Sequence, residues 1–241
     1  MTDSSSTDID APETLARRYV AWWNEQNGAR PGTETMRIVD GLRLRVSRSV
    51  FSPDVRLTYA PTLMCEVMPD SLRGKRVLDL GTGCGVLAIT AAVRGAERVV
   101  AVDLSEDAIA DTTANVASHE QAGRIGEGVV VPALGDLYDA LPDADAGPFD
   151  LILANLPIAA EATPWHELGP IADLTQRAIA GLSTHLRAGG TAMFGWASFG
   201  PPGVMPDLLD QAGYTTEMTH AKTFGVTWSI CAARRPISST A

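Results

Sequence analysis

The chain has 241 residues, of which 45% are hydrophobic and 20% charged, and it carries a formal net charge of -10. This length suits one large domain, or one domain with an appendage, and the composition is that of a globular protein, which excludes disordered and fibrous classes. The negative charge disfavours a nucleic-acid partner, because nucleic-acid-binding proteins usually present a basic face.

The first residues, the apolar runs and the cysteines indicate the compartment in which the protein is expected. The first residues are acidic and polar, and no apolar run approaches the roughly 20 residues that span a bilayer. The three cysteines, Cys65, Cys84 and Cys231, are far apart and indicate neither a disulfide framework nor a zinc site. We therefore expect a cytoplasmic protein with no membrane association and no required metal.

The N-terminal part predicts a helix, a hairpin and a second helix. Residues 12–26 place Leu15, Tyr19 and Trp22 or Trp23 at helical spacing. Next, Asp40 and Gly41 separate two apolar-alternating runs, which is the turn chemistry of a β-hairpin. A further helix is expected around residues 57–68. We assign residues 1–10 to a disordered tip, 11–70 to an N-terminal extension that ends in a lid segment, and 71–241 to the main domain.

From Arg76 onward, short apolar runs alternate with helical stretches, as in βαβ units that build a parallel sheet. Strands are predicted at residues 76–80, 98–103, 128–133, 149–154 and 190–196. Helices are predicted between them, at residues 86–94, 106–120 and 171–186. After a short helix that ends at Gly213, residues 215–221 and 227–234 are close enough in sequence to pair antiparallel.

A glycine-rich turn follows the first strand of the main domain. The strand ends in Asp79-Leu80, and Gly81-Thr82-Gly83-Cys84-Gly85 then opens a helix. Glycine is needed where the backbone turns tightly and lies against a ligand, because a Cβ blocks both the dihedral angles and the approach. Dinucleotide-binding turns place a third glycine where this chain has Val86. The spacing therefore differs from theirs, and a turn without a ligand is the alternative interpretation.

The second strand ends in Asp103, 24 residues after Asp79. A carboxylate at this position accepts hydrogen bonds from the two hydroxyls of a ribose in nucleotide-binding βαβ units. Taken alone, Asp103 is also suited to cap the helix that begins near Glu106. Together with the glycine turn, the ribose role is the better interpretation.

The spacing GxGxG, with an acidic residue two positions before the first glycine, resembles motif I of class I methyltransferases that use S-adenosylmethionine (AdoMet). Leu134-Gly135-Asp136-Leu137, after the third strand, looks like the segment of these enzymes whose acid accepts a hydrogen bond from adenine; a turn aspartate is the alternative. The resemblance implies AdoMet as cofactor and S-adenosylhomocysteine (AdoHcy) as product. It implies the following cofactor-binding residues: Asp79, Gly81, Thr82, Gly83, Cys84, Gly85, Asp103, Leu104, Asp136, Leu137 and Asn155.

Asn155-Leu156-Pro157-Ile158, after the fourth strand, resembles the Asn-Pro-Pro-Tyr signature of amino and amide methyltransferases, including the release-factor glutamine and small-domain ribosomal RNA guanine enzymes. The Asn155 side-chain oxygen and a backbone carbonyl would hold the N–H groups of a planar amine or amide in line with the methyl group. Asn155 and Pro157 are thus the predicted catalytic residues. Leu156 and Ile158 depart from the signature, and the missing aromatic disfavours a nucleobase acceptor. A simple exit from the strand is the alternative.

The resemblance extends from about residue 50 to residue 234. It implies an α/β fold, a Rossmann-like, doubly wound, seven-stranded and mostly parallel sheet with an antiparallel last strand pair, to which the N-terminal helix and β-hairpin are added. Phe51-Ser52-Pro53 looks like the segment that closes over AdoMet in these families. Candidate substrate residues are Phe51, Trp165 and His166, although a surface histidine beside a packing tryptophan is the simpler interpretation of His166. Trp22, Trp23 and Phe199 are further residues that either line the pocket or only pack.

The leading hypothesis is AdoMet-dependent methyl transfer to nitrogen on a small molecule or on a peptide or protein side chain. The alternatives are an O-methyltransferase of a small metabolite with His166 as base, an RNA methyltransferase with a basic face near the pocket, and an AdoMet-binding protein without activity. A nicotinamide-dependent oxidoreductase is the remaining enzyme alternative. The sequence leaves the acceptor and the oligomeric state open.

Overall fold

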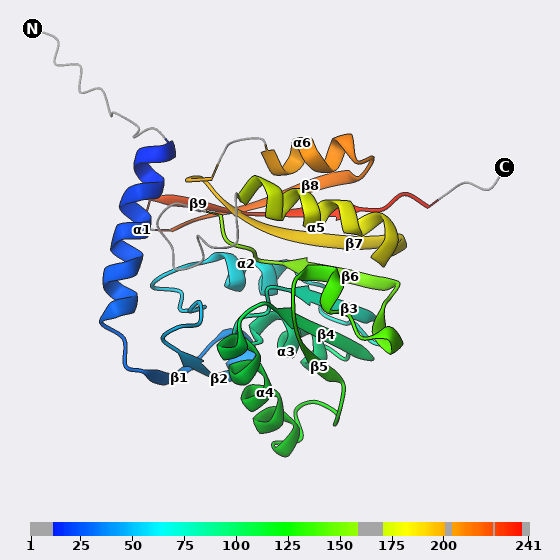
Figure 1. Cartoon of the computed structure of the whole chain (residues 1–241), viewed down its shortest axis with the longest axis horizontal. Helices are drawn as coiled ribbons and strands as arrows, with labels where there is room; N and C mark the ends of the chain where they lie inside the picture. The colour runs from blue at the N-terminus through cyan, green and yellow to red at the C-terminus, as the bar shows by residue number, and fades with distance from the viewer. Residues whose placement is uncertain (1–11, 159–170, 201–203, 224, 238–241) are drawn as a thin grey trace, which may run out of the picture.

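The computed structural model describes residues 12–158, 171–200, 204–223 and 225–237. Its centre is a seven-stranded sheet with the order β5-β4-β3-β6-β7-β9-β8 (Figure 1). The strands are β3 (Arg76–Leu80), β4 (Arg98–Asp103), β5 (Val130–Leu134), β6 (Phe149–Ala154), β7 (Leu186–Ala197), β8 (Thr215–Thr223) and β9 (Val226–Arg234). The first five pair in parallel, whereas β9 runs antiparallel to both β7 and β8. The predicted Rossmann-like fold with an antiparallel last strand pair is confirmed.

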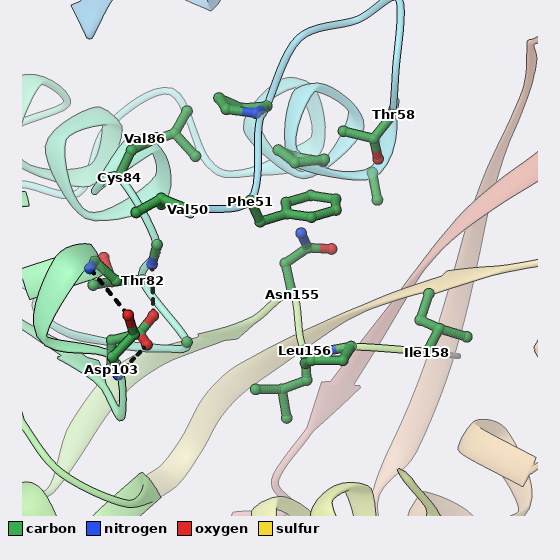
Figure 2. Close-up of a pocket in the computed structure, with 18 of the residues that line it drawn as sticks. Val50, Phe51, Thr58, Thr82, Cys84, Val86, Asp103, Asn155, Leu156 and Ile158 are labelled. Carbon is green, nitrogen blue, oxygen red and sulfur yellow. Dashed lines mark hydrogen bonds between the residues drawn. The ribbon is translucent and has the colours of Figure 1, made fainter. Parts of the chain in front are cut away.

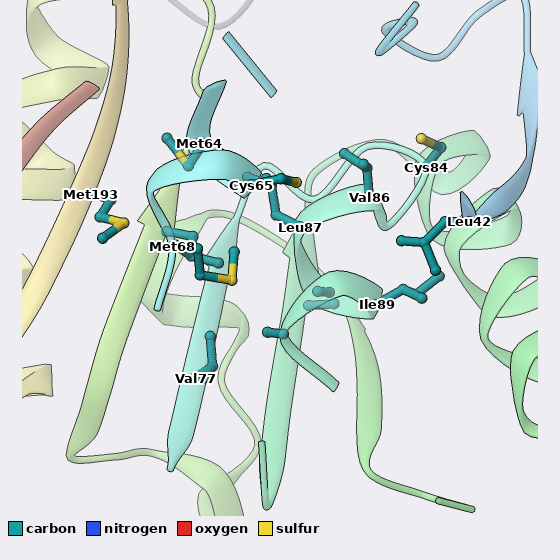
Figure 3. Close-up of a cluster of buried hydrophobic side chains, with 14 of the residues drawn as sticks. Leu42, Met64, Cys65, Met68, Val77, Cys84, Val86, Leu87, Ile89 and Met193 are labelled. Carbon is teal, nitrogen blue, oxygen red and sulfur yellow. The ribbon is translucent and has the colours of Figure 1, made fainter. Parts of the chain in front are cut away.

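Helices cover both faces of the sheet. They are α2 (Ala60–Val67), α3 (Val86–Val93), α4 (Glu106–Gln121), α5 (Ile171–His185) and α6 (Val204–Gln211). Successive strand residues point to opposite faces, so Val77 joins the core cluster under α2, α3 and α4, while Leu78 joins the cluster under α5 and α6. Figure 3 shows Val77 in the first cluster, together with Met64 of α2 and Leu87 of α3.

Several predicted boundaries were wrong. The strand predicted from residue 190 begins at Leu186, directly after α5, because Leu186 pairs with Phe149 before the register shifts. Gly189, whose φ is 74°, lies within this irregular stretch. The helix predicted from residue 57 begins at Ala60, where Pro61 occupies the first turn, a position that suits its fixed φ and missing N–H. β5 also begins two residues later than predicted, at Val130.

The N-terminal segment forms helix α1 (Pro12–Gly28) and the hairpin of β1 (Thr33–Arg37) and β2 (Arg43–Ser47), as predicted. At the tip of the hairpin, Asp40 and Gly41 have φ angles of 58° and 68°, the left-handed values that the turn requires. Short 3-10 turns complete the element list: η1 (Val39–Gly41), η2 (Leu137–Ala140) and η3 (Asp143–Asp145).

Buried polar side chains of α4 hold the hairpin on the main domain. Asn115 accepts a hydrogen bond from the Arg45 N–H at 2.7 Å and donates to the Arg45 carbonyl at 2.8 Å. The same amide nitrogen donates to the carbonyl of Cys84 at 2.8 Å. One turn earlier, Asp111 accepts from the backbone N–H of Ser47 at 2.6 Å. Because this spacing of four residues aligns side chains on one helix face, α4 ties β2 to the glycine loop.

The helices and the cysteines also bear on membrane association and on disulfide formation. Within the described part of the chain, no helix combines the length and apolarity that a bilayer crossing demands. Cys65, Cys84 and Cys231 are all buried, and none is in a disulfide. Burial raises the pKa of the Cys65 thiol to about 11, so this thiol is in its neutral form at neutral pH.

Candidate functional site

The glycine loop joins β3 to α3 and has the backbone that the sequence predicts. Gly81, Gly83 and Gly85 have φ angles of 73°, 58° and 85°, which side-chain-bearing residues rarely adopt. A Cβ on Gly81 would also lie 3.0 Å from Cδ2 of Leu156, so this position is crowded as well as left-handed. At Gly83 the nearest atom to such a Cβ is 3.9 Å away, on Val50, which leaves the loop backbone open on that side.

Asp79 lies behind this loop. Its side chain is fully buried and its Oδ2 accepts hydrogen bonds from the Thr82 hydroxyl at 2.7 Å and from the Ala88 N–H at 3.1 Å. Burial raises the pKa of Asp79 to about 7, against the lowering effect of these two bonds. Asp79 is not among the residues that line the cavity. Its evident role is to fix the loop and the first turn of α3.

Asp103 ends β4 and spans the gap between two backbone segments. Its Oδ2 accepts from the Gly83 N–H and its Oδ1 from the Ser105 N–H, each at 2.9 Å (Figure 2). The N-cap of α4 is Ser105, whose hydroxyl accepts from the Ala108 N–H, so the helix-capping role considered for Asp103 falls to its neighbour. Burial raises the pKa of Asp103.

A single cavity at the C-terminal edge of β3, β4, β5 and β6 brings most of the predicted residues together. The predicted cofactor-binding residues that line it are Gly81, Thr82, Gly83, Cys84, Asp103, Leu104, Asp136, Leu137 and Asn155. The predicted catalytic residue Pro157 and the candidate substrate residue Phe51 line it too. Gly85 does not, because it lies under Thr112 of α4. Trp165 and His166 lie outside the described residues.

At the end of β5, Asp136 and Leu137 face the cavity from the side next to β4. Leu137 is 8% exposed and has a φ of 45°. The Asp136 carboxylate pairs with Arg177 of α5 at 2.5 Å, with both side chains about two-fifths exposed. Sequence reasoning did not anticipate this arginine, since no local pattern relates residues 41 positions apart.

Asn155 follows β6, and its side chain points toward the ring of Phe51 in Figure 2. Gly195 of β7 makes room for it: a Cβ there would lie 2.4 Å from Oδ1 of Asn155. The two departures from the Asn-Pro-Pro-Tyr signature both pack against glycines. Leu156 contacts Gly81, and a Cβ on Gly200 would lie 2.6 Å from Cγ2 of Ile158.

Aromatic residues from distant parts of the chain form the rest of the cavity wall. Trp23 of α1 stacks on Phe51, with ring centroids 5.7 Å apart and an interplanar angle of 12°. Tyr19 stacks on Phe199 at 4.5 Å, and Trp228 of β9 meets Tyr19 edge-on at 5.6 Å. The Tyr19 hydroxyl donates to the Leu57 carbonyl at 2.6 Å, and burial raises the Tyr19 pKa.

Of these aromatics, Trp23, Phe51 and Phe199 were candidates from the sequence, whereas Tyr19 and Trp228 were missed as cavity residues. Tyr19 carried a helical-spacing signal but nothing that distinguished the pocket from the core. Trp22 is 37% exposed and does not line the cavity. No group of three histidine, cysteine, aspartate or glutamate side chains able to hold a metal ion is found in the described ranges.

The sheet order, the glycine loop and Asp103 together define a Rossmann-like methyltransferase domain of the AdoMet-dependent class. Residues 41–227 match the family model described as "Methyltransferase small domain", which is most of the chain. The chain therefore belongs to the methyltransferase small domain family.

Curated relatives are similar over part of the chain. A ribosomal protein L11 methyltransferase of Sorangium cellulosum is 35% identical over 106 residues, which is 43% of this chain and 31% of that protein. A release factor glutamine methyltransferase of Chlorobaculum tepidum is 42% identical over 95 residues, which is 39% of this chain and 31% of that protein. The aligned part is therefore less than a third of each relative's length.

Among solved structures, the T. thermophilus 16S rRNA N2 G1207 methyltransferase in complex with AdoMet and guanosine has a TM-score of 0.60 and 21% identity. The likeness covers 84% of this chain and 50% of that one, and at this identity it concerns the fold alone.

The residues present fit AdoMet. The loop of residues 81–83 leaves its backbone open toward the cavity at Gly83. Asp103 presents a carboxylate held by two N–H groups, whose remaining lone pairs suit ribose hydroxyls. Leu104 and Leu137 offer apolar contacts beside it, and Leu104 is 51% exposed.

Proposed function

We propose that the protein transfers the methyl group of AdoMet to a nitrogen atom of a small molecule or of a peptide or protein side chain. One observation carries this proposal: the Asn155 side chain leaves the end of β6 and enters the same cavity as Asp103 and the glycine loop. An amide oxygen there is suited to accept a hydrogen bond from an N–H group of the acceptor.

AdoMet, when bound, supplies an electrophilic methyl group on a sulfonium ion. The chain contributes binding and orientation. Asp103 would accept hydrogen bonds from the ribose hydroxyls. One carboxylate oxygen of Asp136 pairs with Arg177, and the other would accept a hydrogen bond from the adenine amino group. Asp79 does not enter the cavity, so we assign it the task of fixing Thr82.

The side-chain oxygen of Asn155 would accept a hydrogen bond from one N–H group of the acceptor nitrogen. This bond would orient the lone pair of that nitrogen toward the methyl group. Pro157 has a fixed φ, which limits the directions that the neighbouring Leu156 backbone can take. Holding two reacting groups in line can lower a barrier by about 7 kcal/mol or more. The apolar residues around Asn155, among them Phe51 and Ile158, exclude water from the reacting atoms.

The relatives and the charge favour an acceptor other than nucleic acid. Both curated relatives are named for protein substrates, ribosomal protein L11 and release factor glutamine. A net charge of -10 repels a phosphate backbone. The exposed side chains of Arg37, Arg43 and Arg45 on the hairpin favour the RNA alternative considered above.

The test combines AdoMet binding with a methyl-transfer assay. Calorimetry with AdoMet should show one site per chain, and AdoHcy release should be measured on a panel of amines, amides and phenols. In Asn155→Ala we expect turnover to fall at least 100-fold while AdoMet affinity changes much less, because the amide acts on the acceptor.

Asn27→Ala, the same change at an asparagine that does not line the cavity, is the matched control and should retain activity. Methylation of phenols alone, or equal turnover in Asn155→Ala, would contradict the nitrogen assignment. Absence of AdoMet binding would contradict the function as a whole.

A further inference from the structure

The cavity has two chemically different sides. In Figure 2, Asp103 and Thr82 lie on one side, and Phe51, Thr58, Asn155 and Ile158 lie on the other. The first side presents the carboxylate and loop backbone described above. The second side is where a methyl acceptor must lie, because Asn155 belongs to it. Its chemistry therefore limits the kind of acceptor.

On this side, Phe51 belongs to a set of five ring-bearing residues that line the cavity, and we call this set the aromatic wall. They are Tyr19, Trp23, Phe51, Phe199 and Trp228. Each of their rings is backed by another ring, as the stacked pairs Trp23–Phe51 and Tyr19–Phe199 show. Trp23, Phe199 and Trp228 are each less than 8% exposed, so the wall is rigidly packed. Such a wall suits a flat ligand, because offset stacking needs two planar faces.

Among the described residues, the charged groups of the cavity come from the ends of β4 and β5. Among the described residues that line the cavity, the charged side chains are those of Asp103 and Asp136. Asp103 is the last residue of β4, and Asp136 follows β5. In the sheet, β3 separates these two strands from β6. On the side of Asn155, the polar side chains among the described lining residues are uncharged, and the hydroxyl of Thr58 is one of them.

A charged acceptor would gain little from this wall. A cation over an aromatic face gains about 0.5–2 kcal/mol, whereas removing an ion from water costs several kcal/mol when no counter-ion is present. The desolvation cost exceeds the gain. A neutral planar ring loses no ionic hydration and gains stacking and apolar burial.

We propose that the acceptor is a small, uncharged aromatic molecule whose ring stacks on Phe51, with its nucleophilic atom toward Asn155. This inference rests on the proposed function and narrows it to one class of substrate. Phe51 is the residue of the wall toward which Asn155 points, and Trp23 stacks on one face of its ring. Position 158 cannot supply such a face, since it is isoleucine and packs on Gly200.

The experiment uses the full chain saturated with AdoHcy, whose own affinity is measured first by calorimetry. Three probes of similar size are then titrated at neutral pH. They are 2-naphthol, which is planar and neutral, decahydro-2-naphthol, which is neutral but not planar, and 1-naphthylmethylamine, which is planar but cationic. We expect 2-naphthol to bind at least five-fold more tightly than either of the others.

Variants then locate the probe. Phe51→Leu should weaken 2-naphthol binding at least five-fold and leave AdoHcy affinity within two-fold, while Phe51→Tyr should retain both affinities because the ring is kept. Trp22→Leu, an aromatic-to-aliphatic change on α1 outside the cavity, is the matched control. Retained AdoHcy binding shows that each variant is folded.

The outcomes separate the two proposals. If AdoHcy binds but the three probes bind alike, or the amine binds best, the acceptor class is wrong and the methyltransferase proposal stands. Equal loss of AdoHcy and 2-naphthol binding in Phe51→Leu would place Phe51 on the cofactor side and overturn the stacking role. If AdoHcy itself does not bind, the proposed function fails, and this inference with it.

Discussion

At the residue scale, Asp103 joins the glycine loop to the start of α4 through the N–H groups of Gly83 and Ser105. Replacing it by alanine removes the acceptor assigned to the ribose and frees both N–H groups. We expect Asp103→Ala to weaken AdoMet binding at least ten-fold, about 1.4 kcal/mol, in calorimetry. Asp107→Ala, an exposed carboxylate four residues on, is the control and should bind normally. An unchanged affinity in Asp103→Ala would remove the ribose assignment.

Asp79 gives a prediction about pH. Because burial raises its pKa to about 7 in the folded chain, the carboxyl contributes stability below its ordinary pKa near 4, and this contribution is lost as the pH rises through 7. Asp79→Asn does not titrate. Its free energy of unfolding relative to the unchanged chain should therefore rise by at least about 1 kcal/mol between pH 4.5 and pH 8. Urea denaturation at several pH values measures this, and a constant difference would contradict it.

The sequence predicts which residues line the cavity where a strand end and a glycine turn set their positions. Gly81, Gly83 and Asp103 follow from spacing alone, because the C-terminal ends of adjacent parallel strands meet at one edge. The burial of Asp79 behind the loop did not follow, since spacing does not tell which way a carboxylate faces. Nor did Trp228, which reaches the cavity only through the antiparallel pairing of β9 with β7.

At the element scale, β7 determines where the end of β6 can lie. Gly195 leaves the space that Asn155 occupies, since a Cβ there would overlap Oδ1 of Asn155 at 2.4 Å. We expect Gly195→Ala to displace this amide and to lower methyl-transfer turnover at least ten-fold while the chain remains folded. Gly28→Ala, at a glycine with no neighbour within 4 Å of the added carbon, is the matched control. Turnover and melting temperature are measured together, and full activity in Gly195→Ala would mean that Asn155 tolerates the shift.

The secondary-structure predictions succeeded where apolar runs end sharply. β3, β4 and β6 have the predicted bounds, because each is a short buried strand that ends at a polar or turn residue. The start of β7 was missed by four residues because Leu186 read as the end of a helix and residues 187–189 as a connection. Only the pairing of Leu186 with Phe149 makes them part of the sheet. Local sequence does not encode that pairing.

At the scale of the whole molecule, Asn115 connects three parts that are distant in sequence. Its amide bonds to both backbone groups of Arg45 in the hairpin and to the Cys84 carbonyl in the glycine loop. Asn115→Ala leaves these buried groups without their partner, at about 1–3 kcal/mol for each group that stays unsatisfied. We expect a loss of at least about 2 kcal/mol of unfolding free energy and weaker AdoMet binding as well.

Gln121→Ala, on the exposed end of the same helix, controls for changes in helix propensity. Chemical denaturation gives the stability, and calorimetry gives the AdoMet affinity. A loss of stability with unchanged AdoMet affinity would show that the hairpin and the loop are not coupled through this residue.

Helix α1 ends before residue 41, where the match to the family model begins. Tyr19 and Trp23 thus reach the cavity from a part of the chain that the family model does not describe, whereas the glycine loop and Asp103 fall within it. Part of the aromatic wall proposed above therefore comes from outside the family match, whereas Phe51 and Asn155 come from within it. If Tyr19 and Trp23 contact the acceptor as proposed, a substitution in the first helix alters the choice of acceptor and leaves the glycine loop and Asp103 as they are.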